Sequence, residues 1–163
     1  MDAPAIAIGG TNAGTGVWMD GAVVIGALGG TDTVTVGDGV FGIQGRTGVD
    51  ITANDAVDIY EIVRSTDGNV VIATTSNLVS GDITLRDGSS VTGKNVGLSA
   101  ANDVIILGDQ NNTLGTYTFT ADNQIQLGAD VEALLGITFA SPTLLIADSA
   151  VTSNQGSVEF ADD

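Results

Sequence analysis

Apolar and polar residues alternate with a period of two along several short segments of the chain. Residues 33–36 alternate threonine with valine, residues 116–120 place two aromatic residues between threonines, and residues 124–127 alternate glutamine with aliphatic residues. Because successive side chains of a β-strand point to opposite faces, this pattern predicts strands with one buried and one exposed face. Continuous apolar runs at residues 104–107 and 144–146 predict strands that are covered on both faces.

Four Asp-Gly pairs separate the β-like segments from one another. Asp-Gly favours a tight type I′ turn, because both central residues of that turn require positive φ and this pair tolerates it well. We therefore expect consecutive antiparallel hairpins at these positions. The pairs are Asp20-Gly21, Asp38-Gly39, Asp67-Gly68 and Asp87-Gly88.

A helical pattern is found at one place only. The candidate spans residues 128–136, where Asp130 can serve as the N-cap and Gly136 can end the helix. At most one short helix is therefore expected, near residues 130–136.

Turn signals recur roughly every 8–12 residues, which is typical of all-β sandwiches and barrels. The intervals between the Asp-Gly pairs are unequal and show no fixed period, so a parallel β-helix with regular coils is not expected. The sequence predicts an all-β fold, an antiparallel β-sandwich, jelly roll or barrel-like single domain of about ten to twelve short strands.

The 163 residues of the chain suit one domain. Residues 1–16 are rich in glycine and are expected to form an N-terminal arm or loop, and residues 17–163 are expected to form the single β domain. Since 43% of the residues are hydrophobic, the domain can build a packed core.

The charge of the chain is strongly unbalanced. Four Lys and Arg residues against 20 Asp and Glu residues give a formal net charge of −16. Nucleic acids and anionic lipids are bound first through Lys and Arg, so neither is an expected partner. No segment has the roughly 20 apolar residues of a membrane-spanning helix, and no membrane insertion is expected. Two explanations of the acidity stay open, an ordinary soluble surface and adaptation to high salt.

The residue types that most often carry catalysis are missing. The chain has no histidine and no cysteine, which excludes Ser–His–Asp and Cys–His arrangements. Lys94 is the only lysine, and its Gly-flanked polar surroundings predict a turn rather than the activator of a serine. Paired carboxylates could hydrolyse glycosides, but the chain has few aromatic residues to bind a sugar. We therefore expect no enzymatic activity and no catalytic residues.

Four segments match ligand-binding loops only in part. Residues 9–16 are rich in glycine but lack the lysine of a phosphate-binding loop. Residues 29–34 and 102–105 each contain a single copy of a pattern that binds calcium in tandem repeats. The segment that starts at Asp109 begins like an EF-hand loop, but Leu114 and Thr120 stand where that loop needs glycine and glutamate. No metal ligand, cofactor or cofactor-binding residue is predicted.

These features favour a structural subunit. We expect a virion protein, in the outer capsid shell or as a capsid decoration protein, because the chain starts at Met1 and shows no signal peptide. The alternative is a surface-layer, pilus or adhesin-type extracellular module at the cell surface. The expected partners are the chain itself, as a homo-oligomer, and other structural subunits of the same assembly, with the arm of residues 1–16 as the expected contact.

Overall fold

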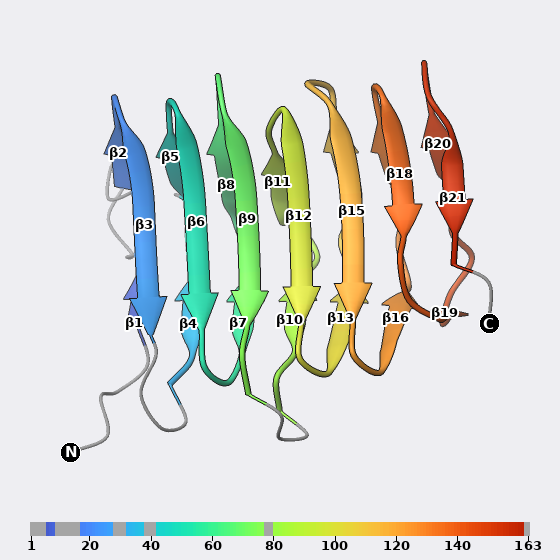
Figure 1. Ribbon diagram of the computed structural model, residues 1–163, viewed down its shortest axis with the longest axis horizontal. Coiled ribbons are helices and arrows are strands. Elements are labelled where there is room, and N and C mark those ends of the chain that lie inside the picture. The colour runs from blue at the N-terminus through green and yellow to red at the C-terminus, as the bar shows by residue number, and fades with distance from the viewer. Residues whose placement is uncertain (1–5, 9–16, 28–31, 38–41, 77–79, 162–163) are drawn as a thin grey trace.

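The chain winds into a right-handed parallel β-helix whose coils stack side by side (Figure 1). The computed structural model describes residues 6–8, 17–27, 32–37, 42–76 and 80–161. Successive strands fall on three faces in turn, so that one coil contributes one strand to each face. In Figure 1 the strands of the front face run downward and those behind them run upward while the coils advance from left to right, which is the right-handed sense.

Two of the three faces are seven-stranded parallel sheets. Sheet C, at the front of Figure 1, consists of β3 (Ala22–Ala27), β6 (Gly48–Ala53), β9 (Asn69–Thr74), β12 (Asn95–Ala100), β15 (Thr116–Ala121), β18 (Gly136–Phe139) and β21 (Val158–Phe160). Sheet A consists of β1 (Ile6–Ile8), β4 (Val34–Val36), β7 (Val57–Ile59), β10 (Ile83–Leu85), β13 (Asp103–Ile106), β16 (Gln124–Leu127) and β19 (Thr143–Leu145).

The third face is divided between two shorter parallel sheets. Sheet B consists of β2 (Val17–Met19), β5 (Ile43–Gly45), β8 (Ile62–Ser65) and β11 (Ser90–Thr92). Sheet D consists of β14 (Gln110–Asn112), β17 (Val131–Ala133) and β20 (Val151–Ser153).

Two buried amide side chains connect sheet B to sheet D. The side-chain oxygen of Gln110 accepts a hydrogen bond from the N–H of Val91 at 3.0 Å, and that of Asn112 accepts one from the N–H of Gly93 at 3.3 Å. A buried N–H without a partner costs about 1–3 kcal/mol. These side chains therefore maintain the coil-to-coil connection where the backbone ladder is interrupted.

The core consists of columns in which equivalent side chains of successive coils lie against one another. One column of sheet C is aliphatic in the early coils and aromatic in the late ones. Its members are Ile25, Ile51, Ile72, Leu98, Phe119, Phe139 and Phe160. The ring centroids of Phe119 and Phe139 lie 5.3 Å apart, and the two rings are stacked. Since full burial of such a side chain stabilises a fold by roughly 1.5–3 kcal/mol, these columns hold the coils together.

The predicted alternation of buried and exposed positions is confirmed in β4, β15 and β16. Their hydrophobic side chains point inward and are buried, while the threonines and glutamines between them reach the outer surface. The buried residues are Val34, Val36, Tyr117, Phe119, Ile125 and Leu127.

Carboxylates connect successive coils at the corner between sheets C and A. Oδ1 of Asp82 accepts hydrogen bonds from the backbone N–H of Asp103 at 3.1 Å and from the side chain of Asn102 at 2.7 Å. One coil later, Oδ1 of Asp103 accepts the equivalent bonds from the N–H of Gln124 at 3.3 Å and from the side chain of Asn123 at 2.8 Å. The corner geometry of one coil is thus fixed by a carboxylate of the preceding coil.

Close approach of the backbone requires glycine at the corner that leads into sheet C. A Cβ at Gly115 would lie 1.7 Å from the carbonyl oxygen of Lys94, and a Cβ at Gly156 would lie 1.4 Å from that of Leu135. Any other residue at these two positions would push neighbouring coils apart.

The predicted antiparallel sandwich, jelly roll or barrel of ten to twelve strands is wrong. The structure has strands β1 to β21, and every strand pair of the described residues is parallel. A parallel pair cannot be closed by a tight hairpin, so the chain travels around the other two faces before it returns to the same sheet.

The predicted hairpins at the Asp-Gly pairs are also wrong. Three of the pairs lie at corners between strands of different sheets, and these strands do not pair with each other. They are Asp20-Gly21, Asp67-Gly68 and Asp87-Gly88, whereas Asp38-Gly39 lies outside the described residues. Gly88 has a φ of 82°, but no residue other than glycine has positive φ in the described chain, so the type I′ geometry is not formed.

The short helix predicted near residues 130–136 does not form. Asp130 precedes β17, and the other residues belong to β17, to the following corner and to the start of β18. The neighbouring strands β14 and β20 both pair with β17, and this pairing outweighs the weak local preference for a helix.

The expectation that regular coils are absent is wrong as well. Late in the helix, contacting residues of neighbouring coils are 20 or 21 positions apart, as for Ala121 with Ser141 and Asp103 with Gln124. Asn69 and Asn95 are 26 positions apart, because the corner between β9 and β10 is longer. Corners of different length therefore conceal the repeat in the sequence.

Candidate assembly surface

The last coil of the described helix has three strands without a partner on their outer side. β19, β20 and β21 pair with β16, β17 and β18, and each is the end strand of its sheet. Backbone N–H and C=O groups therefore point outward along three faces of this coil, at the right-hand end of Figure 1. Unpaired strand edges of this kind are templates for the binding of further strands.

Two core columns end on this coil with an exposed side chain. Leu145 continues the column of Leu127, and Phe160 continues the column of Phe139. Leu127 and Phe139 are fully buried, whereas Leu145 is 64% exposed and Phe160 is 53% exposed. The last coil thus presents to solvent the type of side chain that the preceding coil buries.

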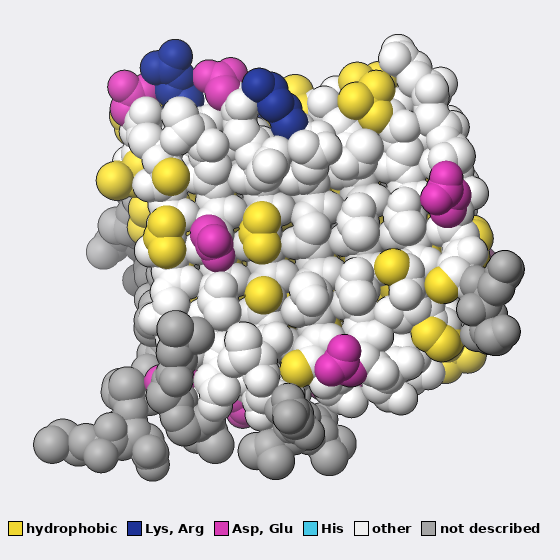
Figure 2. Space-filling model, viewed as in Figure 1, with side chains coloured by type: hydrophobic (Ala, Val, Ile, Leu, Met, Phe, Trp, Pro, Cys, Tyr) yellow, Lys and Arg dark blue, Asp and Glu magenta, His cyan; other side chains and the backbone are white. Residues whose placement is uncertain are grey.

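Two apolar residues next to Leu145 in the chain are exposed as well. Leu144 points to the outer side of sheet A and Ile146 follows β19, and we call the set Leu144, Leu145, Ile146 and Phe160 the terminal apolar surface. Figure 2 shows hydrophobic side chains at the right-hand end of the molecule, where the last coil lies. Grouped apolar side chains on a surface mark interaction sites more often than single ones do.

The sequence predicts that the strand at residues 144–146 is covered on both faces, and this is wrong. The strand itself is found, as β19, but Leu144 and Leu145 are exposed. No further coil covers this strand within the described residues. In the register of sheet A, Leu144 and Leu145 pair with Gln126 and Leu127. The two leucines therefore lie on the outermost described strand of that sheet.

Inward side chains at the opposite end of the helix are covered to different degrees, and Met19 of β2 is 48% exposed. Val23 and Ala27 of β3 are 6% and 4% exposed, although β3 has only one partner strand among the described residues, β6. Both ends of the described helix therefore expose some of their inward apolar side chains.

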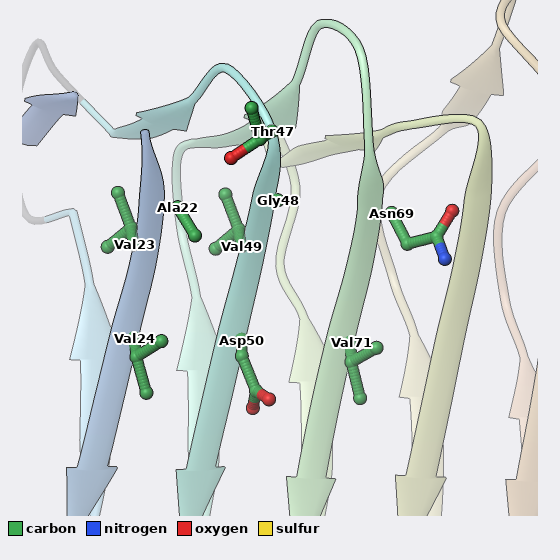
Figure 3. A pocket seen from close by; sticks show the side chains of 9 residues that line it. All are labelled: Ala22, Val23, Val24, Thr47, Gly48, Val49, Asp50, Asn69 and Val71. Atoms are coloured by element: carbon green, nitrogen blue, oxygen red, sulfur yellow. The ribbon is translucent and has the colours of Figure 1, made fainter. Parts of the chain in front are cut away.

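A shallow hollow of about 270 Å³ lies on the outer face of sheet C (Figure 3). Val24, Asp50 and Val71 occupy neighbouring outward positions on three adjacent strands, and Gly48 leaves room beside them. The carboxylate of Asp50 accepts a hydrogen bond from Oγ1 of Thr52 at 3.3 Å. Asp50 is the one titratable residue among the described residues that line the hollow. These lining residues therefore do not provide both a general acid and a general base.

Two arginines form ion pairs between coils. Arg46 contacts Asp20 and Asp67, each at 3.1 Å, and Arg86 contacts Asp58 at 2.6 Å. The hydrogen bond to Asp67 is the main cause that raises the pKa of Arg46, and the hydrogen bond to Asp58 is the main cause that raises the pKa of Arg86. Both guanidinium groups therefore stay charged and connect neighbouring coils.

Lys94 lies in a bend between β11 and β12 with its side chain exposed, as the predicted turn requires. Its backbone N–H donates to the carbonyl oxygen of Gly68, and its own carbonyl oxygen accepts from the N–H of Thr116. The residue therefore contributes to the coil-to-coil contacts of this corner.

The segments compared with calcium-binding loops also connect coils. Asp103 accepts a further hydrogen bond from the side chain of Gln126 at 2.8 Å, and Asp109 accepts one from the N–H of Asp130 at 3.1 Å. Within the described ranges, no three His, Cys, Asp or Glu side chains are grouped as metal ligands. Residues 9–16 and 29–31, from the other loop-like segments, lie outside those ranges.

Comparison with models of protein families, with curated protein sequences and with solved structures finds no match to this chain. In the part of the chain that the structure describes, no helix has the length and apolar character needed to cross a membrane.

Proposed function

We propose that this chain is a non-enzymatic structural subunit of a larger protein assembly and that the terminal apolar surface is its contact. The observation that carries the proposal is the exposure of Leu145 and Phe160 at positions whose equivalents in the preceding coil are fully buried. Burial of a leucine or phenylalanine side chain contributes roughly 1.5–3 kcal/mol, so a partner that covers both would gain substantially.

The architecture supports a structural role. Backbone hydrogen bonds between parallel strands, stacked aromatic rings and side-chain hydrogen bonds connect neighbouring coils. Solenoids of this kind gain stability from each interface between adjacent coils. The outer face of sheet C carries mainly small side chains, which leaves a flat surface for contacts between subunits. Examples are Gly48, Ala73, Gly97, Ser99, Thr118 and Thr138.

We propose two settings for the assembly. The first is the outside of a virion, as an outer capsid shell or decoration protein, because a net charge of −16 disfavours contact with packaged nucleic acid. The second is a surface-layer, pilus or adhesin-type module. A β-helix suits this second setting better than the antiparallel sandwich expected from the sequence would. The reason is that solenoids extend along one axis and build elongated structures.

Immunogold labelling with antibodies against the purified chain tests this proposal on intact particles and cells of the source. Label on the outer surface of purified virions supports the first setting, and label on the cell envelope supports the second. Label dispersed through the cytoplasm, away from any assembly, would contradict both settings.

A further inference from the structure

We propose that Asp87-Gly88 is a modification site at which the folded chain spontaneously forms isoaspartate, whichever assembly the chain belongs to. Among the described Asp-Gly pairs, the fold leaves this one most free to react. The pair forms the corner between β10 and β11, and both of its residues are exposed. Gly88 has a φ of 82°, and a Cβ there would meet no atom within 4 Å. The corner is therefore open to water and to movement of the aspartate side chain.

The reaction needs only these two residues and water. The nitrogen of Gly88 attacks Cγ of the protonated Asp87 carboxyl group, whose hydroxyl leaves as water with the N–H proton, and a succinimide ring forms. Water then adds to a ring carbonyl and breaks its bond to nitrogen. Addition at Cγ restores aspartate, whereas addition at the main-chain carbonyl gives isoaspartate, in which the main chain continues through Cβ and Cγ. Glycine favours the attack, because no Cβ stands beside its nitrogen and its backbone adopts many conformations.

Neither reacting group is held elsewhere at this corner. Within the described part of the chain, no hydrogen bond or ion pair engages the carboxylate of Asp87 or the N–H of Gly88. The N–H of Ser89 closes the turn instead, by donating to the carbonyl oxygen of Arg86 at 3.0 Å. The carboxyl group of Asp87 can therefore approach the following nitrogen without giving up a contact.

Both reacting groups are held at Asp67-Gly68. Nε of Arg46 donates to Oδ2 of Asp67 at 3.1 Å, and the N–H of Gly68 donates to Oγ of Ser65 at 3.0 Å. Space is limited as well, since a Cβ at Gly68 would lie 1.8 Å from the carbonyl oxygen of Thr47. The corner must open and lose both hydrogen bonds before a succinimide ring can close there.

Asp20-Gly21 is held less firmly. The carboxylate of Asp20 contacts Arg46 at 3.1 Å, but the two side chains are 74% and 57% exposed. Exposed ion pairs contribute only about 0–1 kcal/mol, so this contact opens readily. A Cβ at Gly21 would meet no atom within 4 Å. We therefore expect isoaspartate to form fastest at Asp87, more slowly at Asp20 and slowest at Asp67.

Isoaspartate at position 87 adds a carbon atom to the main chain of a turn that is fixed on both sides. Arg86, before the turn, contacts Asp58 at 2.6 Å. Ser89, after it, is buried, and its Oγ accepts a hydrogen bond from Nε2 of Gln110 at 3.1 Å. Gln110 is one of the side chains that connect sheet B to sheet D. The longer turn should therefore weaken this connection and lower the stability of the helix.

Ageing of the purified natural chain, in the folded state and in concentrated urea, tests the inference. Samples are kept at physiological temperature and neutral pH. Isoaspartate is then counted in the denatured chain by enzymatic transfer of a methyl group to its free carboxylate. Asp87→Ser, Asp67→Ser and Asp20→Ser are aged in parallel. Each replaces an exposed side chain, so all three variants should fold, and circular dichroism checks this.

In the folded samples, Asp87→Ser should lose more isoaspartate relative to the natural chain than Asp20→Ser does, and Asp67→Ser should lose almost none. In urea the three losses should become similar, because unfolding releases the contacts of Arg46 and Ser65. The aged natural chain should also unfold at a lower urea midpoint than the fresh one, and aged Asp87→Ser should not.

Two results would overturn the inference. One is a folded natural chain that forms no isoaspartate while the chain in urea does. The other is a loss in folded Asp87→Ser that is no larger than the loss in Asp67→Ser or Asp20→Ser.

Discussion

The ring of Phe160 lies on the ring of Phe139, with centroids 4.7 Å apart and planes inclined by only 6°. Phe139 is fully buried and also stacks on Phe119, whereas Phe160 ends the column and is half exposed. The same residue type therefore has two different roles in adjacent coils, one in holding the core together and one in forming its uncovered end.

Truncation of these two rings should separate the roles. Phe139→Ala leaves a cavity between two coils and should lower the free energy of unfolding by about 3–5 kcal/mol. Phe160→Ala removes one stacking contact and part of a half-exposed ring, and should cost the monomer only about 0.5–1.5 kcal/mol. Urea unfolding of both variants at low protein concentration measures the difference. Equal losses would show that Phe160 is as buried as Phe139 in solution.

The carboxylate of Asp103 should stabilise the helix more than an exposed acid of the next coil does. Asp103→Ala leaves the corner donors of Asn123, Gln124 and Gln126 without their acceptor and should cost about 1–3 kcal/mol. Asp122→Ala is the matched control, since it removes the same charge from an exposed side chain at the same corner. If urea unfolds both variants at the same midpoint, the carboxylate contacts do not stabilise the coils.

Replacement of glycine by alanine should have opposite effects at two positions. Gly115→Ala places a Cβ 1.7 Å from the carbonyl oxygen of Lys94, and relief of this clash should cost about 1–3 kcal/mol. A Cβ at Gly97 meets no atom within 4 Å, so Gly97→Ala should be neutral or stabilise by up to about 1 kcal/mol. Thermal unfolding should give a lower midpoint for the first variant only. A similar decrease for both would contradict the close packing at the corner into sheet C.

Alkaline pH should destabilise the fold through Tyr117. Its buried hydroxyl donates to the carbonyl oxygen of Val91 at 2.6 Å, and burial raises the pKa of Tyr117 above its ordinary value of 10.0. The folded state therefore keeps the proton that the unfolded state loses. This contribution to stability is fully present below about pH 10 and is lost as the pH rises further towards the folded-state pKa.

Tyr117→Phe tests this prediction. The variant should lose about 0.5–1.5 kcal/mol at neutral pH with the hydrogen bond, and its stability should fall less steeply than that of the natural chain above about pH 10. Tyr60→Phe is the control, because Tyr60 is exposed. Urea unfolding at a series of pH values provides the measurement. An unchanged slope for Tyr117→Phe would show that the phenol is accessible to solvent.

Much of the local structure could be predicted from the sequence, but the way in which strands pair could not. Alternation at residues 116–120 correctly identifies β15, because a half-buried strand has the same period in parallel and antiparallel sheets. Asp67-Gly68 is compatible both with a corner between two faces and with a hairpin. Which of the two forms depends on the strand that pairs with β9, the strand after this pair of residues. One partner of β9 is β12, which lies far along the chain, and corners of unequal length conceal the repeat that would have identified it.

The sequence predicts that the chain associates with itself, but it does not predict that the last coil exposes apolar side chains. The sequence predicts self-association, which stays a proposal, and it places the contact in residues 1–16, most of which lie outside the described residues. Leu144 and Leu145 look like core residues in the sequence, because an apolar run has the same composition in an inner coil and in the last one. Their exposure follows from the position of β19 at the end of sheet A, which is a property of the whole helix.

Sedimentation velocity at low and high salt tests most directly whether the terminal apolar surface drives assembly. The range of electrostatic repulsion falls from about 30 Å at 0.01 M salt to about 3 Å at 1 M, so the natural chain should be largely monomeric in dilute buffer and associate as NaCl is added. Leu145→Asp should stay monomeric throughout, while Val24→Asp, an equal change at an exposed site near the far end of sheet C, should associate like the natural chain. A natural chain that stays monomeric at 1 M NaCl, or loss of association in Val24→Asp but not in Leu145→Asp, would contradict the account.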